Sequence, residues 1–217
     1  LSPFDFSAID YLEDLGTPAY KIASFEIVDL PLIDYAARTG KPLIISTGMA
    51  NKQEISEAIA AAKNAGCNQL AVLHCVSGYP APAEEYNLKT IKKMSKEFGV
   101  PVGLSDHTIG STCAIASVVM GANIIEKHFT LDRTGGGPDD SFSMEPQDLE
   151  QLCRDVKIAW SSIGNATFER TESELGNVKF RRSLYYVNDL EAGSIITVND
   201  IRSVRPGYGL SPKFFDK

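Results

Sequence analysis

The sequence predicts an α/β protein, in which part of a (β/α)8 TIM barrel occupies most of the chain and a small β-rich segment follows it. Three observations support this. Five short apolar runs alternate with amphipathic, helix-like patterns, each apolar run ends in polar or ionisable residues, and the alternation stops after residue 163. Alternating strands and helices imply a parallel sheet whose strands are joined by crossover helices.

The predicted strands have the length and apolar character of buried parallel strands. They cover residues 19–24, 42–46, 70–75, 100–105 and 122–128. The predicted helices cover residues 7–15, 30–39, 52–65, 88–98 and 112–120, and a sixth begins at Pro146. The third helix has the clearest boundaries, because Asn51 and Glu54 have the spacing of a capping box and Gly66 follows the last turn.

A doubly wound sheet and a barrel both fit this alternation, so the polar residues at the strand ends decide between them. Those residues are Lys21, Ser24, Ser46, Thr47, His74, Ser77, Ser105, His107, Glu126 and His128. A barrel builds its site from successive strands in this way, whereas a doubly wound fold concentrates its site in one crevice. Five units cannot close an eight-stranded barrel, so we expect about three N-terminal strands to lie outside this chain.

The domain organisation follows from where the pattern changes. We assign residues 1–163 to the partial barrel, 164–179 to a linker and 180–217 to a small β domain. Residues 164–177 are polar and irregular, whereas residues 183–187, 194–197 and 202–204 are β-like pieces separated by turn signals.

Composition excludes several classes of function. The chain has 217 residues and a net charge of -7, which argues against a nucleic-acid partner. No apolar run approaches the ~18 residues of a membrane span, and no signal peptide is visible. The four cysteines, Cys67, Cys75, Cys113 and Cys153, are scattered and indicate buried free thiols in a reducing compartment. We therefore expect a cytoplasmic protein with neither a nucleic-acid nor a membrane partner.

Two of the three histidines, His107 and His128, end consecutive predicted strands. Imidazoles near carboxylates suit a divalent metal such as Mn²⁺ that keeps open positions for substrate. A hydrogen-bonded core histidine is the alternative for either residue alone, but two equivalent positions favour the metal. We expect the third, His74, to have a structural role.

Lys21 lies among apolar residues in the first predicted strand, where an unpaired ammonium group would be costly to bury. It could clamp a phosphate or carboxylate with help from the hydroxyls of Ser24, Ser46 and Thr47. It could instead form a Schiff base, as in class I aldolases, or a buried salt bridge, for example with Glu26.

For three loop features, the local sequence does not decide between a functional and a purely structural role. The three glycines at 135–137 lack the pattern of a phosphate-binding loop, so this segment either closes over a substrate and brings Asp139 inward or is a plain solvent loop. Tyr79, next to Pro80, could form an aromatic wall of a site. Arg205, followed by proline and glycine, reads as a turn by default.

Together, the motifs at residues 21–24, 45–49, 74–80, 103–108 and 126–139 resemble the sialic acid synthase family in order and approximate spacing. The two motifs that contain His107 and His128 are the most specific. The tail, residues 182–207, resembles the antifreeze-like (SAF) domain of the same family. The resemblance covers nearly the whole chain.

The resemblance implies a barrel, a linker and an antifreeze-like domain in a domain-swapped homodimer. It implies that His107 and His128 bind a divalent metal, Mn²⁺ or Mg²⁺, and that Lys21 and Asp139 are catalytic. The residues that match substrate-binding positions are Ser2, Phe4, Lys21, Ser24, Ser46, Ser77, Tyr79, Ser105, Asp139 and Arg205. Arg205 matches an arginine that reaches the partner's sugar N-acyl group. The family's catalytic glutamate and a phosphate-binding lysine would lie before Leu1.

The implied reaction condenses phosphoenolpyruvate with 2,4-diacetamido-2,4,6-trideoxy-L-altrose and water to give pseudaminic acid and phosphate. The glycine-rich loop and residues 21–26 favour a pseudaminic acid synthase over an N-acetylneuraminate or legionaminate synthase. In the mechanism we expect, the metal polarises the sugar aldehyde, carbon 3 of phosphoenolpyruvate attacks it, and water adds at carbon 2 before phosphate leaves. The rivals from other classes are a Schiff-base aldolase that uses Lys21 and a non-catalytic carbohydrate-binding relic.

Overall fold

A computed structural model describes residues 1–216. The chain divides into two compact units, one spanning residues 1–164 and the other beginning at residue 165. All four cysteines are free, as the sequence predicted. Cys67, Cys75 and Cys113 are buried, but the prediction of burial is wrong for Cys153, which is exposed. No helix among the described residues is both long and apolar enough to cross a membrane.

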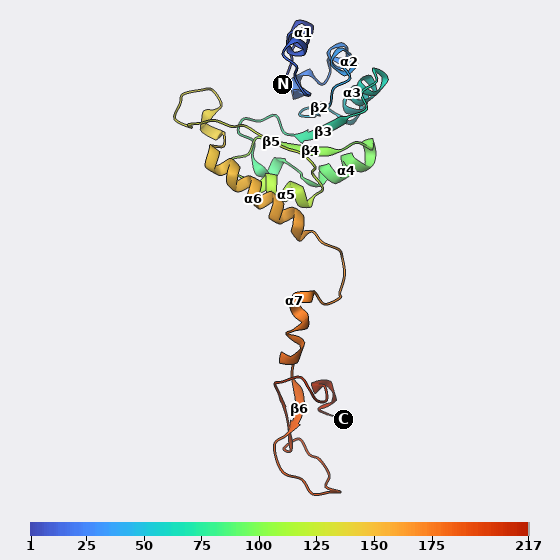
Figure 1. Ribbon diagram of the computed structural model, residues 1–217, viewed down its shortest axis with the longest axis vertical. Coiled ribbons are helices and arrows are strands. Elements are labelled where there is room, and N and C mark those ends of the chain that lie inside the picture. The colour runs from blue at the N-terminus through green and yellow to red at the C-terminus, as the bar shows by residue number, and fades with distance from the viewer. Residues whose placement is uncertain (217) are drawn as a thin grey trace. The chain divides into compact units, whose positions relative to one another are not determined.

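The first unit is built on a curled, five-stranded parallel sheet (Figure 1). Its strands are β1 (Tyr20–Ile22), β2 (Leu43–Ser46), β3 (Leu70–Cys75), β4 (Val102–Asp106) and β5 (Ile125–Lys127). Each strand pairs with the next one along the chain, in the order β1-β2-β3-β4-β5. A doubly wound sheet would reverse its strand order at one point, and this one does not. The predicted barrel arrangement is therefore confirmed.

Helices alternate with these strands along the first unit. They are α1 (Phe6–Asp14), α2 (Leu30–Arg38), α3 (Lys52–Asn64), α4 (Lys89–Phe98), α5 (Thr112–Val119) and α6 (Pro146–Ser162). The predicted capping box of α3 is present, because the Asn51 side chain accepts from the backbone N–H of Glu54 and the Glu54 carboxylate accepts from that of Asn51. Local sequence signals thus set the helix boundaries to within one or two residues.

The hydrophobic core fixes which way the strand side chains point. Ile22, Ile45 and Leu104 are each fully buried within one apolar cluster. Successive residues of a strand face opposite sides of the sheet. The residues next to these core positions, which include Lys21 and Ser105, therefore face the other side, toward the barrel interior.

The second unit contains a short helix, α7 (Glu172–Leu175), and an antiparallel pair of strands, β6 (Ser183–Tyr186) and β7 (Ile201–Val204). The prediction of a further β piece at residues 194–197 is wrong. The Asp200 carboxylate accepts hydrogen bonds from the N–H and hydroxyl of Thr197, at 2.8 and 2.6 Å, and these bonds hold a turn there. Ile195 is 88% exposed, so its apolar side chain provides no packing for a strand.

Candidate active site

A polar cavity of about 350 Å³ lies at the carboxyl ends of the strands of the first unit. It is lined by Ser2, Lys21, Ala23, Ser24, Ser46, Tyr79, Ser105, His107, Glu126, Lys127 and His128. A larger groove of about 730 Å³ shares residues 126–128, but the rest of its lining is mainly apolar and includes side chains of α6. Ionisable groups from β1, β4 and β5 converge only on the smaller of these two cavities, which makes it the candidate site.

Lys21 has a carboxylate partner inside this cavity. Its Nζ lies 3.2 Å from Oε1 of Glu126, and its side chain is 14% exposed. The Ser105 hydroxyl donates to the same carboxylate oxygen at 2.7 Å. The alternative of a buried salt bridge is therefore observed, but its partner is Glu126 on β5, at the opposite edge of the sheet, and not Glu26.

Glu126 is therefore a site residue to which the sequence analysis gave no role. A signal for it existed. Glu126 stands two residues before His128, and strand periodicity puts residues two apart on the same face. The pairing of β4 with β5 also places Glu126 opposite Ser105. That register depends on how the two strands pack, so the spacing of residues in the sequence does not reveal it.

Hydroxyl groups surround the turn that follows β2. The Ser24 hydroxyl accepts from the Gly48 N–H at 3.1 Å and contacts the Cys75 Sγ at 3.4 Å. The Ser46 hydroxyl is buried and has no hydrogen-bond partner among the described residues. Buried polar groups are rarely left unpaired, so this hydroxyl is suited to a ligand. A Cβ on Gly48 would overlap the Ser77 hydroxyl and lie 2.7 Å from that of Ser24.

The two predicted metal ligands lie side by side. The ring centroids of His107 and His128 are 5.2 Å apart, with an interplanar angle of 74°. The Nδ1 of His107 is 2.8 Å from the Val76 carbonyl oxygen, which fixes the proton on Nδ1 and leaves the Nε2 lone pair free. The Nδ1 of His128 lies 3.4 Å from a carboxylate oxygen of Asp139.

This separation suits one shared cation. A ring nitrogen ~2.1 Å from a metal puts the ring centroid ~3.2 Å from it, so two rings at cis coordination angles have centroids roughly 4.5 to 5.2 Å apart. The observed 5.2 Å lies at the upper end of that range. In the described part of the chain, no group of three or more His, Cys, Asp or Glu side chains could hold an ion by itself. Water or substrate oxygens would complete the coordination.

Electrostatics distinguish the two imidazoles. Burial lowers the pKa of His128, and a positive charge on His107 lowers it further. Burial also lowers the pKa of His107, but the contacts with the Cys75 thiol and the Val76 carbonyl outweigh it, so the pKa is raised overall. His128 is thus the imidazole that more readily stays neutral, as a metal ligand must.

Aromatic rings cover the imidazoles on the side of the loops. The Tyr79 ring centroid lies 4.3 Å from that of His107 and 5.7 Å from that of His128. Phe142, for which the sequence predicted no role in the site, lies 5.1 Å from His128 by the same measure. Beneath Tyr79 the His107 side chain is buried, whereas the His128 side chain remains 30% exposed.

Three more predicted site residues of the first unit, Phe4, Ser77 and Asp139, are not part of the cavity lining. Phe4 is 64% exposed, and Ser77 is half-buried behind the turn. Asp139 contacts the cavity lining through its ion pair with His128. Arg205 is exposed in the second unit. His74, expected to be structural, contacts the Tyr86 carbonyl oxygen through Nε2 and does not line the cavity.

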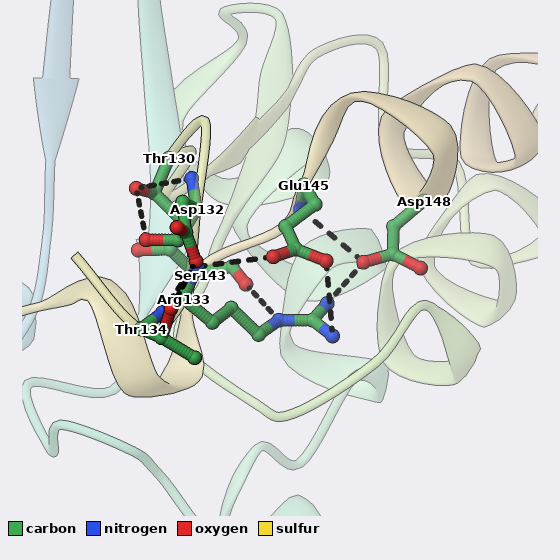
Figure 2. Close-up of polar contacts among 7 residues, drawn as sticks. All are labelled: Thr130, Asp132, Arg133, Thr134, Ser143, Glu145 and Asp148. Carbon is green, nitrogen blue, oxygen red and sulfur yellow. Dashed lines mark hydrogen bonds and ion pairs between the residues drawn. The ribbon is translucent and has the colours of Figure 1, made fainter.

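The loop that carries Asp139 is anchored at its base, as Figure 2 shows. Arg133 donates from Nε to the Ser143 carbonyl at 2.9 Å and forms ion pairs with Glu145 and Asp148 at the start of α6. The backbone of residue 144 also bonds to residues 128 and 130, both at 2.9 Å. These contacts hold both ends of the glycine-rich loop next to His128.

Comparison with known proteins places the chain in a family. A model of the NeuB family matches residues 1–168, and a model of the SAF domain matches residues 181–217. The pseudaminic acid synthase of Helicobacter pylori is 42% identical over 99% of this chain and 63% of its own length. The N,N'-diacetyllegionaminic acid synthase of Campylobacter jejuni is 39% identical over 100% of this chain and 66% of its own.

A solved structure agrees with these sequence matches. The crystal structure of N-acetylneuraminic acid synthetase from Leptospira borgpetersenii superimposes with a TM-score of 0.76 at 34% identity, over 82% of this chain and 62% of that one. The chain thus spans a little under two thirds of the length of such relatives. On the match of residues 1–168, the chain belongs to the NeuB family, and a SAF domain follows the NeuB-family region.

Proposed function

We propose that the protein condenses phosphoenolpyruvate with an acetamido sugar and water to give a nonulosonic acid and phosphate. One observation carries the proposal: a single cavity places the Lys21 ammonium and several hydroxyls beside a pair of imidazoles. Such a site matches an anionic substrate together with a metal-activated carbonyl. Relatives named for nonulosonic acid synthesis support the same chemistry.

For the sugar, we propose 2,4-diacetamido-2,4,6-trideoxy-L-altrose, which would make the product pseudaminic acid. The 42% identity to the Helicobacter pylori pseudaminic acid synthase supports this choice. A legionaminic acid synthase is the second candidate, because the Campylobacter jejuni relative of that name is 39% identical. The two identities are close, so only a substrate comparison separates these alternatives.

The phosphoenolpyruvate end of the site would be formed by Lys21 and the serine hydroxyls. The Lys21 ammonium lies at the cavity wall, already fixed by Glu126, and would pair with a phosphate or carboxylate group. Ser24, just after β1, and Ser46, at the end of the neighbouring β2, would donate hydroxyl hydrogen bonds beside it. The unpaired Ser46 hydroxyl would gain its missing partner on binding, which makes the contact favourable.

The sugar end would be formed by the imidazoles and their neighbours. A divalent metal, Mn²⁺ or Mg²⁺, would supply Lewis-acid polarisation of the sugar aldehyde. His107 and His128 would hold it, Asp139 would orient the His128 ring, and Tyr79 would exclude water. No side chain needs to bond covalently to substrate, so positioning and charge matching would supply most of the catalysis.

The Schiff-base alternative is disfavoured by the surroundings of Lys21. A nucleophilic lysine must be a neutral amine, and such lysines are desolvated or lie next to other cations. Lys21 instead lies 3.2 Å from the Glu126 carboxylate, which stabilises the charged ammonium. The Glu126 contact thus keeps the Lys21 side chain charged, as binding an anionic substrate group requires.

We also propose a domain-swapped homodimer in which Arg205 binds the sugar N-acyl group in the partner's site. Light scattering of the purified protein should give the mass of a dimer. Arg205→Ala should then raise KM for the sugar while leaving KM for phosphoenolpyruvate within about twofold. A monomeric mass at micromolar concentration would refute this assembly.

The decisive experiment is a phosphate-release assay on the complete protein that contains this chain. Each reaction contains phosphoenolpyruvate, Mn²⁺ and one sugar, either the 6-deoxy altrose derivative or N-acetylmannosamine. We expect turnover with the first sugar, loss of turnover with EDTA, and no labelling of Lys21 by borohydride. Turnover with only N-acetylmannosamine would refute the pseudaminate assignment. Borohydride trapping would support the aldolase. No phosphate release with either sugar would refute the pseudaminate assignment and leave the legionaminic acid synthase and the non-catalytic protein, which the same assay with the legionaminate precursor sugar separates.

A further inference from the structure

A buried ion pair lies directly behind the two imidazoles. The Lys127 ammonium is 3.2 Å from Oδ2 of Asp106, and their side chains are 4% and 0% exposed. Each residue immediately precedes one of the histidines in the chain. We propose that this pair is the positioning device that holds His107 and His128 at the separation needed to share one cation. The inference rests on the metal site of the proposed function.

The first argument is that strand pairing stops just before the histidines. The β4–β5 ladder pairs Leu104 with Ile125, Ser105 with Glu126, and finally Asp106 with Lys127. His107 and His128 are the next residues, one position beyond the last pair. A side-chain contact at that final pair is therefore the feature best placed to keep the two strand ends together.

The second argument concerns the backbone around His107. Oδ1 of Asp106 accepts from both the N–H and the hydroxyl of Thr108, at 2.9 and 2.8 Å. The Lys127 ammonium donates to the Thr108 carbonyl oxygen at 2.6 Å. Asp106 and Lys127 thus both bind Thr108. His107 lies between Asp106 and Thr108 in the chain, so its backbone is held on both sides. Lys127 in turn is bonded covalently to His128, so the pair links both imidazoles.

The third argument is that stability alone is a weak reason for such a pair. Two charges removed from water are often no more stabilising than apolar side chains of similar volume, although removing only one of them is strongly destabilising. Residues behind the ligands of a metal commonly change its affinity about 10- to 100-fold when they are replaced.

The test compares ion-pair variants of the complete protein. Asp106→Leu/Lys127→Met replaces the pair with apolar side chains, and Asp106→Asn removes one charge at nearly constant shape. The matched control is Glu13→Leu/Lys41→Met, which removes a 2.7 Å ion pair at the other end of the sheet. Circular dichroism reports folding, titration followed by electron paramagnetic resonance reports Mn²⁺ affinity, and pulsed measurements report the imidazole nitrogen couplings.

We expect wild-type protein to show two imidazole couplings. Both Asp106 variants should weaken Mn²⁺ binding by at least about tenfold and change one coupling, and the control should stay within twofold of wild type. A folded Asp106→Asn or double variant with unchanged affinity and couplings would overturn the inference while leaving the metal site intact. If wild-type protein showed no imidazole coupling, the proposed metal site would itself be wrong, and the inference would fail with it.

Discussion

The turn after β2 leads to the sharpest prediction, that Gly48→Ala disables phosphoenolpyruvate binding without unfolding the protein. The new methyl group would overlap the Ser77 hydroxyl and lie 2.7 Å from Ser24 Oγ, where ordinary contact begins at 3.4 Å. Its neighbours there are mainly side-chain atoms, which can move. Both hydroxyls must therefore shift, the Ser24 hydroxyl by about 0.7 Å or more, while the backbone stays in place.

A misplacement of ~1 Å in a catalytic site lowers rates roughly 100-fold. We therefore expect kcat/KM for phosphoenolpyruvate to fall about 100-fold, equivalent to ~2.7 kcal/mol of transition-state stabilisation. Overpacking should destabilise the fold by only about 1–3 kcal/mol. Phosphate-release kinetics and urea unfolding measure the two effects separately.

Two other glycines serve as controls for this prediction. Gly103→Ala would overlap the backbone carbonyl of Ile124, which cannot move away, so this variant should lose folding as well as activity. The methyl group added by Gly176→Ala would meet no atom within 4 Å, so this variant should keep both its folding and its activity. If Gly48→Ala kept its kcat/KM for phosphoenolpyruvate within twofold of wild type, the hydroxyl groups around the turn would not be the anion site.

Three further substitutions probe separate features. Ser46→Ala removes a buried, unpaired hydroxyl and should raise KM for phosphoenolpyruvate while leaving unfolding free energy equal or up to about 1 kcal/mol higher, measured in urea. Burial lowers the pKa of His74 from 6.5 in the folded protein, so near and below that pH the unfolded chain binds more protons than the folded one. The free energy of unfolding should therefore decrease as the pH is lowered. His74→Asn should flatten that decline, measured by urea unfolding at pH 5.5 and 7.5. Arg133→Ala should speed proteolysis at residues 135–137 while costing less than about 1 kcal/mol overall.

Each of these expectations has an opposite result that would contradict it. A large loss of stability in Ser46→Ala would mean that its hydroxyl has a partner within the folded chain. An unchanged pH slope in His74→Asn would show that another group carries the proton linkage. Equal proteolysis rates for Arg133→Ala and wild type would show that the backbone bonds of residue 144 anchor the loop by themselves.

Features with a local cause were predicted well. The start of α3 at Asn51 and the residues of β3 follow from capping chemistry and from a continuous apolar run, both of which act over a few neighbouring residues. The prediction of the middle β piece, residues 194–197, failed because another local signal outweighed the apolar pattern. Apolar Ile195 and its neighbours suggested a strand, but the competing local hydrogen bonds of Asp200 to Thr197 determined a turn.

By itself, the sequence determined the barrel-type alternation and the set of side chains at the strand ends, because strand and helix periodicity is written in neighbouring residues. The family came from the resemblance of its motifs. Only the tertiary structure decided which of those groups meet. It paired Lys21 with Glu126 and not Glu26, brought the ring centroids of His107 and His128 to 5.2 Å, and buried Asp106 against Lys127. Those choices depend on sheet register and curvature, which arise when distant segments pack and leave no mark on residue spacing.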